Sequence, residues 1–191
     1  MRVYIKEQAC PFRFTNAKWG AFSNFQPLAV PILAGPWSCP TSENLYQACK
    51  FPAHPDIQRR IAEAPTARQA AAIGRTPGLG IDPGWSAQRV HVMRWVLRMK
   101  REANAAEIEA VLAETADRPI VEVSTRDPWW GARPVADRYE GHNVLGRLWM
   151  ELRQQLRKDD PAARSGAWAD HIRVGCLAGA APLAQAAPQS A

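Results

Sequence analysis

The sequence is poor in cysteine and histidine, and those that it has are not grouped. The four cysteines lie far apart, without the paired spacing of zinc sites or redox motifs: Cys10, Cys39, Cys49 and Cys176. We therefore expect no metal site and no cofactor, and thiols that are buried or idle in a reducing compartment. No apolar run reaches the length of a transmembrane helix, and charge interrupts residues 1–7 too early for a secretory signal. The expected location is the cytoplasm, with no membrane partner.

What the chain does have is apolar bulk and positive charge. It is 191 residues long, 47% hydrophobic and contains eight tryptophans, which favours one packed globular domain. The net charge of +6 indicates an anionic partner: a phosphorylated metabolite, a nucleotide or a nucleic acid.

Helical patterns outnumber strand patterns, so we predict an α+β fold: one helix-rich domain with a small sheet. The expected strands are 3–5, 12–15 and 120–124, with one hairpin around Ala34-Gly35. The expected helices are 42–51, 56–63, 66–73, 85–103, 104–115 and 143–157. The domain is predicted to span 1–157, followed by a C-terminal extension, 158–191. The last 15 or so residues, rich in Ala and Pro, are expected to be disordered.

The helix predicted at 42–51 gathers three polar side chains on one stripe. At roughly 100° per residue, Glu43, Gln47 and Lys50 fall within an arc of about 60°. Leu45 and Cys49 lie on the opposite side and are expected to face the core. Periodicity alone favours a solvated polar face; a catalytic stripe is the alternative.

The helix predicted at 85–103 has the clearest amphipathic pattern in the chain. Its apolar stripe is expected to face the core and consists of Trp85, Val92, Met93, Val96 and Met99. Arg94, Arg98 and Arg101 line the far side. They are predicted to form either a solvated face or a ridge that binds nucleic acid.

Four motifs in this order resemble the NADAR family (NAD- and ADP-ribose-associated). The first is F-S-N-F at 22–25, and the second is T-S-E-x-x-x-Q-x-x-K-F at 41–51. Trp85 then opens a helix with Met93 eight residues on. The D-x-x-W-G loop at 127–131 follows, and G-x-N-x-L-G-x-x-x-M-x-x-R starts at Gly141. The resemblance covers about residues 12–157. One departure is Lys100-Arg101-Glu102-Ala103, where relatives often have K-F-x-Q.

The resemblance implies cleavage of N-glycosidic bonds. Substrates of such enzymes include ADP-ribose attached to guanine, and phosphorylated ribosylamino-pyrimidines of early riboflavin synthesis. The family's essential residues match Glu43, Trp85 and Asp127, and its helix lysine matches Lys50. We expect Glu43, Lys50 and Asp127 to be catalytic. The expected substrate-binding residues are Ser23, Asn24, Gln47, Trp85, Trp130, Gly131 and Asn143.

These residue types suit the chemistry. Breaking a C1′–N bond develops positive charge on the ribose and negative charge on the departing base, so two separated carboxylates can divide the work. A lysine that is neutral part of the time can capture the C1′ aldehyde as a Schiff base. A tryptophan can stack on the base.

Less specific interpretations stay open for several of these residues. Asp127 precedes a proline and is a plausible turn former, and Trp85 continues an apolar stripe. Phe22 and Phe25 are expected to pack, leaving Ser23 and Asn24 as exposed hydrogen bonders. His142, beside a helix start, is a candidate general acid but is expected to be structural.

The preferred hypothesis is a metal-independent N-glycosidase that removes ADP-ribose from guanine, in DNA. Such an enzyme would fit an antitoxin paired with an ADP-ribosyltransferase toxin. The first alternative is an N-glycosidase acting on phosphorylated riboflavin-pathway intermediates. The second is a module that binds ADP-ribose without cleaving it, for which Glu43, Lys50 and Asp127 would not all be needed.

Overall fold

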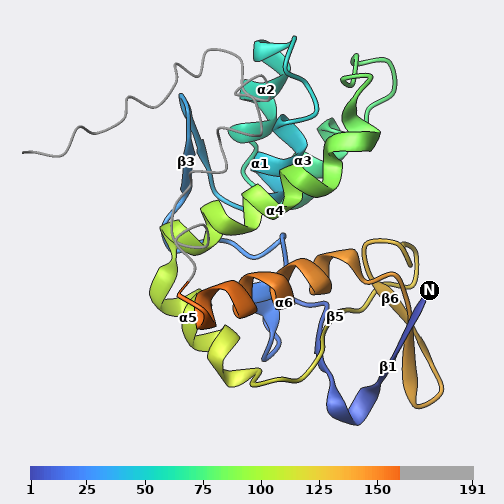
Figure 1. The fold of residues 1–191 in the computed structure, drawn as a ribbon. Helices are drawn as coiled ribbons and strands as arrows, with labels where there is room; N and C mark the ends of the chain where they lie inside the picture. Colours follow the sequence, from blue (N-terminus) through green and yellow to red (C-terminus); the bar gives the residue numbers. More distant parts are fainter. Residues whose placement is uncertain (160–191) are drawn as a thin grey trace, which may run out of the picture.

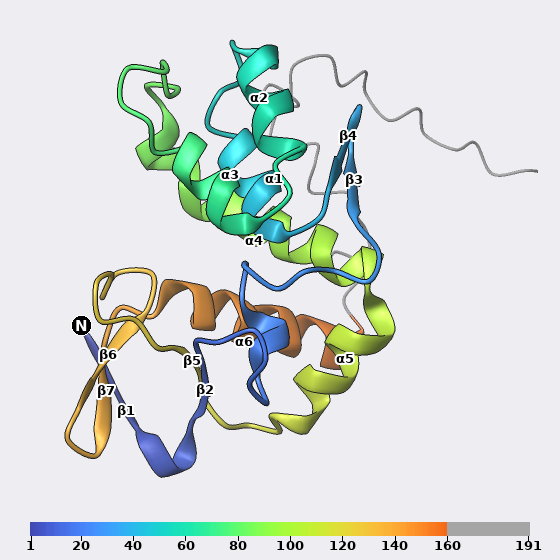
Figure 2. The same ribbon diagram turned by 180° about the vertical axis from the view of Figure 1, so that it is seen from behind.

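The computed structural model describes residues 1–159, and two long helices cross its middle. The helix α4 (Trp85–Ala103) runs beside α6 (Val144–Arg157), and the two pack on each other (Figure 1). The elements on the α4 side are α1 (Ser42–Ala48), α2 (Pro55–Ala62), α3 (Ala67–Ile73) and the hairpin of β3 (Ile32–Ala34) and β4 (Trp37–Cys39). The helix α5 (Ala105–Glu114) and the remaining strands lie on the α6 side, as the reverse view also shows (Figure 2).

The shorter helices follow their local sequence signals. They are α1 (Ser42–Ala48), α2 (Pro55–Ala62), α3 (Ala67–Ile73) and α5 (Ala105–Glu114), with 3₁₀ turns at Lys6–Gln8 and Gly20–Phe22. Thr41 caps α1, because its hydroxyl accepts the Asn44 amide at 3.3 Å, and Thr66 caps α3 in the same way at 3.2 Å. Pro55 occupies the first turn of α2, where its missing N–H costs nothing.

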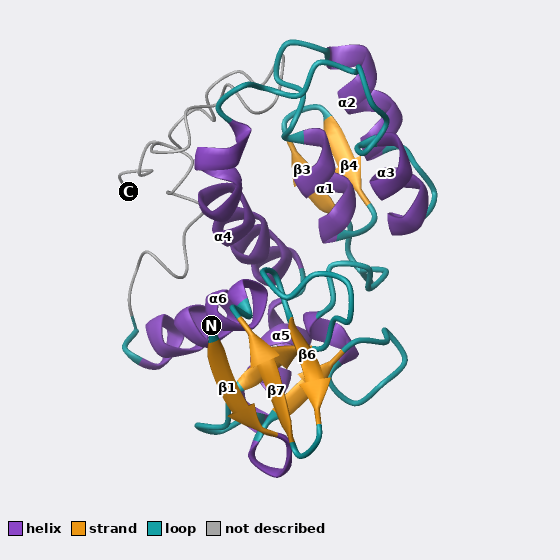
Figure 3. Ribbon diagram, turned by 90° about the vertical axis from the view of Figure 1, so that its right-hand side faces the viewer, coloured by secondary structure: helices purple, strands orange, loops and turns teal. Residues whose placement is uncertain are grey.

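The strands form three small sheets, which are best seen in Figure 3. The largest is antiparallel, in the order β1 (Arg2–Ile5), β7 (Arg138–Gly141), β6 (Ala132–Val135). A parallel pair joins β2 (Cys10–Phe12) to β5 (Ile120–Glu122), with Phe12 opposite Glu122. The third is the hairpin β3 (Ile32–Ala34) and β4 (Trp37–Cys39).

The main core fills the space between α4, α6 and the elements that flank them. Trp149 is fully buried there, and its indole N–H donates to the Phe22 carbonyl at 3.0 Å. Asn44 joins α1 to the end of α2, because its amide donates to the carbonyls of Ile61 and Ala64 at 2.9 Å each. These contacts tie α6 to the turn at Phe22 and α1 to the end of α2.

The predicted α+β class and every predicted helix are confirmed; the helix at 85–103 has the predicted bounds, and the others differ by one to three residues at their ends. The first helix ends at Ala48 rather than at residue 51, and the second strand covers 10–12 rather than 12–15. The β6–β7 hairpin was not predicted, because Pro134 interrupts its strand pattern and its turn uses Ala136 with φ 46° instead of glycine. The predicted disorder of 177–191 lies outside the described residues. No helix within 1–159 is long and apolar enough to cross a membrane.

The arginine face of α4 is neither solvated nor a free ridge, so both predictions for it are wrong. Arg98 is buried and donates to Gln155 of α6 at 3.0 Å. Arg94 forms an ion pair with Glu151 of α6 at 2.8 Å, and Arg101 pairs with Glu109 of α5. Sequence periodicity missed this because α5 and α6 pack on the arginine side of α4, while α1 and β3 also pack on the same helix.

Candidate active site

The polar stripe of α1 is buried, which corrects the solvated face that periodicity favoured. Glu43 is 5% exposed and Gln47 is 3% exposed. The Gln47 amide donates to Glu43 Oε1 at 2.7 Å, and the Glu43 backbone N–H donates to the Asn24 carbonyl at 3.0 Å. Burial raises the pKa of the Glu43 carboxyl, while the Gln47 bond and the charges of Arg75 and Lys50 partly oppose that rise.

Lys50 lies just beyond the end of α1, beside the same carboxyl. Its Nζ donates to the Gly74 carbonyl at 3.3 Å and sits 5.9 Å from the centre of the Trp85 ring. Partial burial lowers the pKa of the Lys50 amine, and the nearby charge of Arg75 lowers it further, whereas Glu43 raises it. The amine is therefore easier to deprotonate than an exposed lysine, as Schiff-base chemistry requires.

The F-S-N-F segment lies beside the start of α1, and its Ser23 and Asn24 are buried, not exposed as predicted. Phe22 packs as predicted, whereas the prediction that Phe25 packs is wrong, since Phe25 is 39% exposed. Ser23 is 8% and Asn24 is 6% exposed. The Asn24 amide nitrogen contacts Met93 Sδ at 3.3 Å, and its Oδ1 is buried without a hydrogen-bond partner among residues 1–159. The Ser23 hydroxyl accepts the Phe25 amide at 3.2 Å and so shapes the turn. An unpaired buried acceptor beside Glu43 is typical of a ligand site.

A fully buried lysine fixes this segment from below. Lys100 Nζ donates to the carbonyls of Ala21 at 2.6 Å and of Ser23 at 2.8 Å, and it faces the Trp149 ring. Burial lowers the pKa of Lys100 to about 7. The side chain holds the loop that carries Asn24, and through the Asn24 carbonyl it supports Glu43.

Aromatic rings form one wall of the site. Tyr46 packs on Trp85, with ring centres 5.1 Å apart, and edge-on against Trp130 at 5.8 Å. Trp130 meets Trp129 at 4.8 Å, and the Arg89 guanidinium lies 3.7 Å above the Trp129 ring. Rings from α1, α4 and the D-x-x-W-G loop thus meet beside Glu43 and Lys50. Flat apolar surfaces of this kind can stack on a base.

The loop at 127–131 is shaped by its own first residue. Asp127 is exposed, and its Oδ1 accepts the amides of Trp129 at 3.0 Å and Trp130 at 2.9 Å. This Asx turn confirms a turn-forming role for Asp127, and the turn places the two tryptophans. Gly131 is buried, and a methyl group there would come within 2.6 Å of the Glu122 carbonyl. Gly131 therefore allows the loop to approach β5.

Asn143 is fully buried, and both ends of its amide are occupied. Its Oδ1 accepts the Glu122 amide at 3.0 Å, and its Nδ2 donates to the Ile120 carbonyl at 2.9 Å. It adopts a left-handed conformation, φ 51°, immediately before α6. These bonds hold β5 against α6, so the structure gives Asn143 a supporting position instead of contact with substrate.

Glu122 is a third carboxylate of the site, and the sequence interpretation missed it. It ends β5 on the same face as Ile120, which packs in the main core, whereas Val121 faces the β1–β7–β6 sheet. Burial raises the pKa of Glu122 to about 8, and the charges of Asp127 and Glu43 add to the rise. The available signal was a carboxylate in an otherwise apolar strand, five residues before Asp127.

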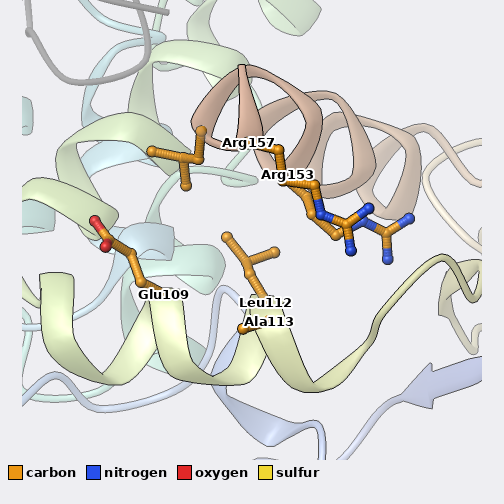
Figure 4. A pocket seen from close by; sticks show the side chains of 6 residues that line it. Glu109, Leu112, Ala113, Arg153 and Arg157 are labelled. Carbon is orange, nitrogen blue, oxygen red and sulfur yellow. The ribbon is translucent and has the colours of Figure 1, made fainter. Parts of the chain in front are cut away.

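The structure thus brings together Glu43, Gln47, Lys50, Trp85 and Trp130, with Asn24 beneath them and the Asp127 loop at the edge. Among residues 1–159 no group of metal-ligating side chains comes together. A pocket lies elsewhere, between α5 and α6 (Figure 4). It is lined by Glu109, Leu112, Ala113, Arg153, Leu156 and Arg157. None of the predicted site residues lines it.

Comparison with known proteins identifies the class. The NADAR domain model matches residues 12–157, so the chain belongs to the NADAR family. N-glycosidase YbiA of Escherichia coli (strain K12) is 35% identical over 145 residues, which cover 76% of this chain and 86% of that one. N-glycosidase Npun_R5314 of Nostoc punctiforme is 34% identical over 141 residues, covering 73% and 86%.

Two further comparisons refine this picture. The NMR structure of the E. coli protein YbiA superimposes with a TM-score of 0.68 at 33% identity, covering 80% of this chain and 87% of that one. The riboflavin biosynthesis protein VVA0006 of Vibrio vulnificus is 32% identical over 163 residues, covering 84% of this chain but 42% of that protein. The family and the α+β fold are therefore established, and N-glycosidase is the class to which its relatives' names point.

Proposed function

We propose that this NADAR-family N-glycosidase removes ADP-ribose from guanine bases, with modified DNA as the preferred substrate. The observation that carries the proposal is the arrangement of a buried carboxyl, a partly buried amine and a wall of indole rings around one place. The carboxyl and amine suit chemistry at ribose C1′, and the rings suit a purine.

Charges around the rings support a substrate that carries phosphates. Arg75 follows Gly74, Arg89 covers the Trp129 ring, and Arg126 precedes Asp127. Arg75 and Arg126 are exposed, and Arg89 is half-buried. They replace Arg94, Arg98 and Arg101, which are paired with side chains of α5 and α6, as candidates for binding a diphosphate or a nucleic-acid backbone.

The roles follow from the geometry. Lys50 attacks C1′ of the ring-opened sugar through its neutral amine, and the departing base leaves a Schiff base that water then hydrolyses. Glu43 stabilises the positive charge that develops at C1′ and accepts the proton of the attacking water. Asp127 holds the loop so that Trp130 and Trp85 flank the base.

Two alternative functions are distinguished from this proposal by the choice of substrate. Relatives named for riboflavin biosynthesis favour a phosphorylated ribosylamino-pyrimidine as the alternative substrate, although those relatives are longer proteins. A module that only binds ADP-ribose would not need an amine poised beside a buried carboxyl.

The test compares three substrates: an ADP-ribosylated guanine in a DNA oligonucleotide, free ADP-ribosyl-guanosine, and a 5-phosphoribosylamino-pyrimidine. We expect release of ADP-ribose from guanine, followed by mass spectrometry, and a rate on DNA that falls as salt rises. Glu43→Gln is the inactive control. Cleavage of the pyrimidine alone would contradict the proposal, and binding of ADP-ribose without cleavage of any substrate would favour the binding module.

The partner predicted for such an antitoxin is an ADP-ribosyltransferase toxin that modifies guanine. Coexpression with such a toxin is expected to restore growth of the host only when Glu43 is intact. Equal growth with the wild type and with Glu43→Gln would contradict the antitoxin role but not the glycosidase reaction.

A further inference from the structure

We propose that Glu122 is the acid that gives a proton to the departing base, a role that rests on the proposed glycosidase reaction. The roles proposed for Lys50 and Glu43 leave the departing base without a proton donor. A base leaving as an anion is a poor leaving group, so its nitrogen needs a proton as the C1′–N bond breaks.

Asp127 is poorly placed to be that donor. Its Oδ1 accepts two amides of its own loop, and its side chain is exposed to water. An exposed carboxyl with an occupied oxygen is suited to shaping a turn, and the two tryptophan rings it places are the groups that need that turn.

Glu122 is placed and prepared differently. Its Oε2 is buried and has no hydrogen-bond partner within the part of the chain that the structure describes. A buried carboxyl oxygen left without a partner is costly for structure alone and is common where a ligand completes the bonding. Its strand face is the one that turns toward the main core, where Ile120 packs in the same cluster as Leu45 and Tyr46 of α1, the helix that carries Glu43.

The backbone of Glu122 is held on three sides. Its N–H donates to Asn143 Oδ1, its carbonyl lies against Gly131, and Phe12 of β2 is its register partner. Such support fixes the direction of a side chain that must deliver a proton at one position. It also explains why Asn143 and Gly131 belong to the motifs without facing the substrate.

Two neighbouring carboxylates favour the protonated form of Glu122. Asp127, from the loop, and Glu43, from α1, are the charged groups that act on it, and burial acts in the same direction. With its pKa raised to about 8, the carboxyl still carries its proton at neutral pH, as a general acid requires.

The step is balanced as follows. The C1′–N bond breaks, its electron pair goes to the base nitrogen, and the Glu122 carboxyl proton is transferred to that nitrogen. C1′ bonds to the neutral Lys50 amine in place of the base, giving a Schiff base. Water adds to that carbon and gives one proton to Glu43; the C1′–Nζ bond then breaks as the proton of the new hydroxyl passes to Nζ, which releases the sugar aldehyde and the neutral lysine. Proton exchange with solvent restores the protonated Glu122 and the ionised Glu43.

The test is Glu122→Gln, measured on whichever N-riboside the wild type cleaves, so that failure of the guanine proposal does not decide it. Glu7→Gln, in an exposed turn, is the matched control. The wild-type kcat/KM is expected to fall above about pH 8 as Glu122 ionises. Glu122→Gln should be slower by about 10²- to 10⁴-fold at pH 7 and should lose that alkaline decline.

A second substrate separates acid catalysis from a structural role. The same ribosyl group that the wild type cleaves, linked to 4-nitrophenolate instead of the base, needs no proton on its leaving group, so Glu122→Gln should cleave it within about threefold of the wild-type rate. A wild-type rate of Glu122→Gln on the N-riboside would overturn the inference. Retention of the alkaline decline, or an equal loss on both substrates, would also overturn it.

Discussion

Gly74 ends α3 directly against the side chain that holds Glu43, and replacing it by alanine tests that contact. Its φ of −65° and ψ of −7° are accessible to any residue, so alanine introduces no backbone strain. A methyl group at this position would lie 2.2 Å from Gln47 Oε1 and 3.0 Å from Gln47 Cβ and Cδ. Carbon atoms in contact stay about 3.5–4.0 Å apart, so the whole Gln47 side chain must move.

The expected decrease in kcat/KM is worked out from the hydrogen bond that Gly74→Ala breaks. Moving Gln47 breaks its 2.7 Å hydrogen bond to Glu43 Oε1. A hydrogen bond to a charged group contributes about 1.5–3 kcal/mol, which corresponds to a decrease in kcat/KM of roughly 10- to 160-fold. Because that bond also lowers the pKa of Glu43, the acidic limb of the pH profile should move to higher pH in Gly74→Ala.

A double-mutant cycle with Gln47→Ala distinguishes this mechanism from general damage. Gln47→Ala empties the space, so adding Gly74→Ala to it should change kcat/KM little. The double variant should also unfold with a free energy about 0.4–1 kcal/mol above that of Gln47→Ala, because alanine restricts the unfolded chain. If Gly74→Ala turned over at the wild-type rate, or if the two losses were additive, the steric argument would be refuted.

Three further predictions concern the titratable groups. Glu43→Gln keeps a bond partner for Gln47 and should lower kcat at least about a hundredfold, with Glu63→Gln as the exposed control. The pKa of Glu43 is higher in the folded state than in the unfolded chain, so ionisation of Glu43 destabilises the fold at pH values above the unfolded pKa. Glu43→Gln should therefore melt at the same or a higher temperature than the wild type at pH 8, and this difference in melting temperature should be lost at pH 4. Borohydride added during turnover should trap the sugar on Lys50, as peptide mass mapping would show, and Lys50→Arg should give neither adduct nor activity; full activity of Lys50→Ala without any adduct would exclude the Schiff base. The pKa of Lys100 is lowered to about 7, so the folded state binds that proton more weakly than the unfolded chain. The free energy of unfolding of the wild type should therefore rise relative to that of Lys100→Met between pH 7 and pH 10. A difference between the two proteins that stays constant across that range would contradict this prediction.

The sequence predicted the members of the site better than their surroundings. Glu43 and Gln47 share a face of α1, a relation that spacing alone fixes, and Lys50 lies beside Glu43 although the helix ends before it. The motifs indicated Trp85 and the Asp127 loop. Periodicity had no means of showing that this face is buried, because its cover comes from Asn24, Gly74 and α4, which are distant in the chain. For the same reason periodicity placed Arg94 and Arg101 of α4 on the polar outer face, although their ion-pair partners lie on α6 and α5.

Glu122 and Gly74 show the other limit of sequence reasoning. A single carboxylate in a short strand has no spacing pattern to distinguish it, and its role depends on two charges brought by α1 and a loop. A glycine at a helix end is ordinarily explained by capping. Here the reason is the approach of another helix's side chain, which only the three-dimensional arrangement reveals.

The pairing of β1 with β7, and of β2 with β5, has a consequence for the newly made chain. During synthesis the half of the site with Glu43 and Lys50 leaves the ribosome about 80 residues before Asp127, a separation that the sequence fixes. Until β7 (Arg138–Gly141) has been synthesised, β1 (Arg2–Ile5) has no strand with which to pair. Contacts between such distant segments form slowly, since a long loop must close first. The enzyme can therefore acquire its activity only once nearly the whole domain has been made, and no shorter nascent chain holds a complete site.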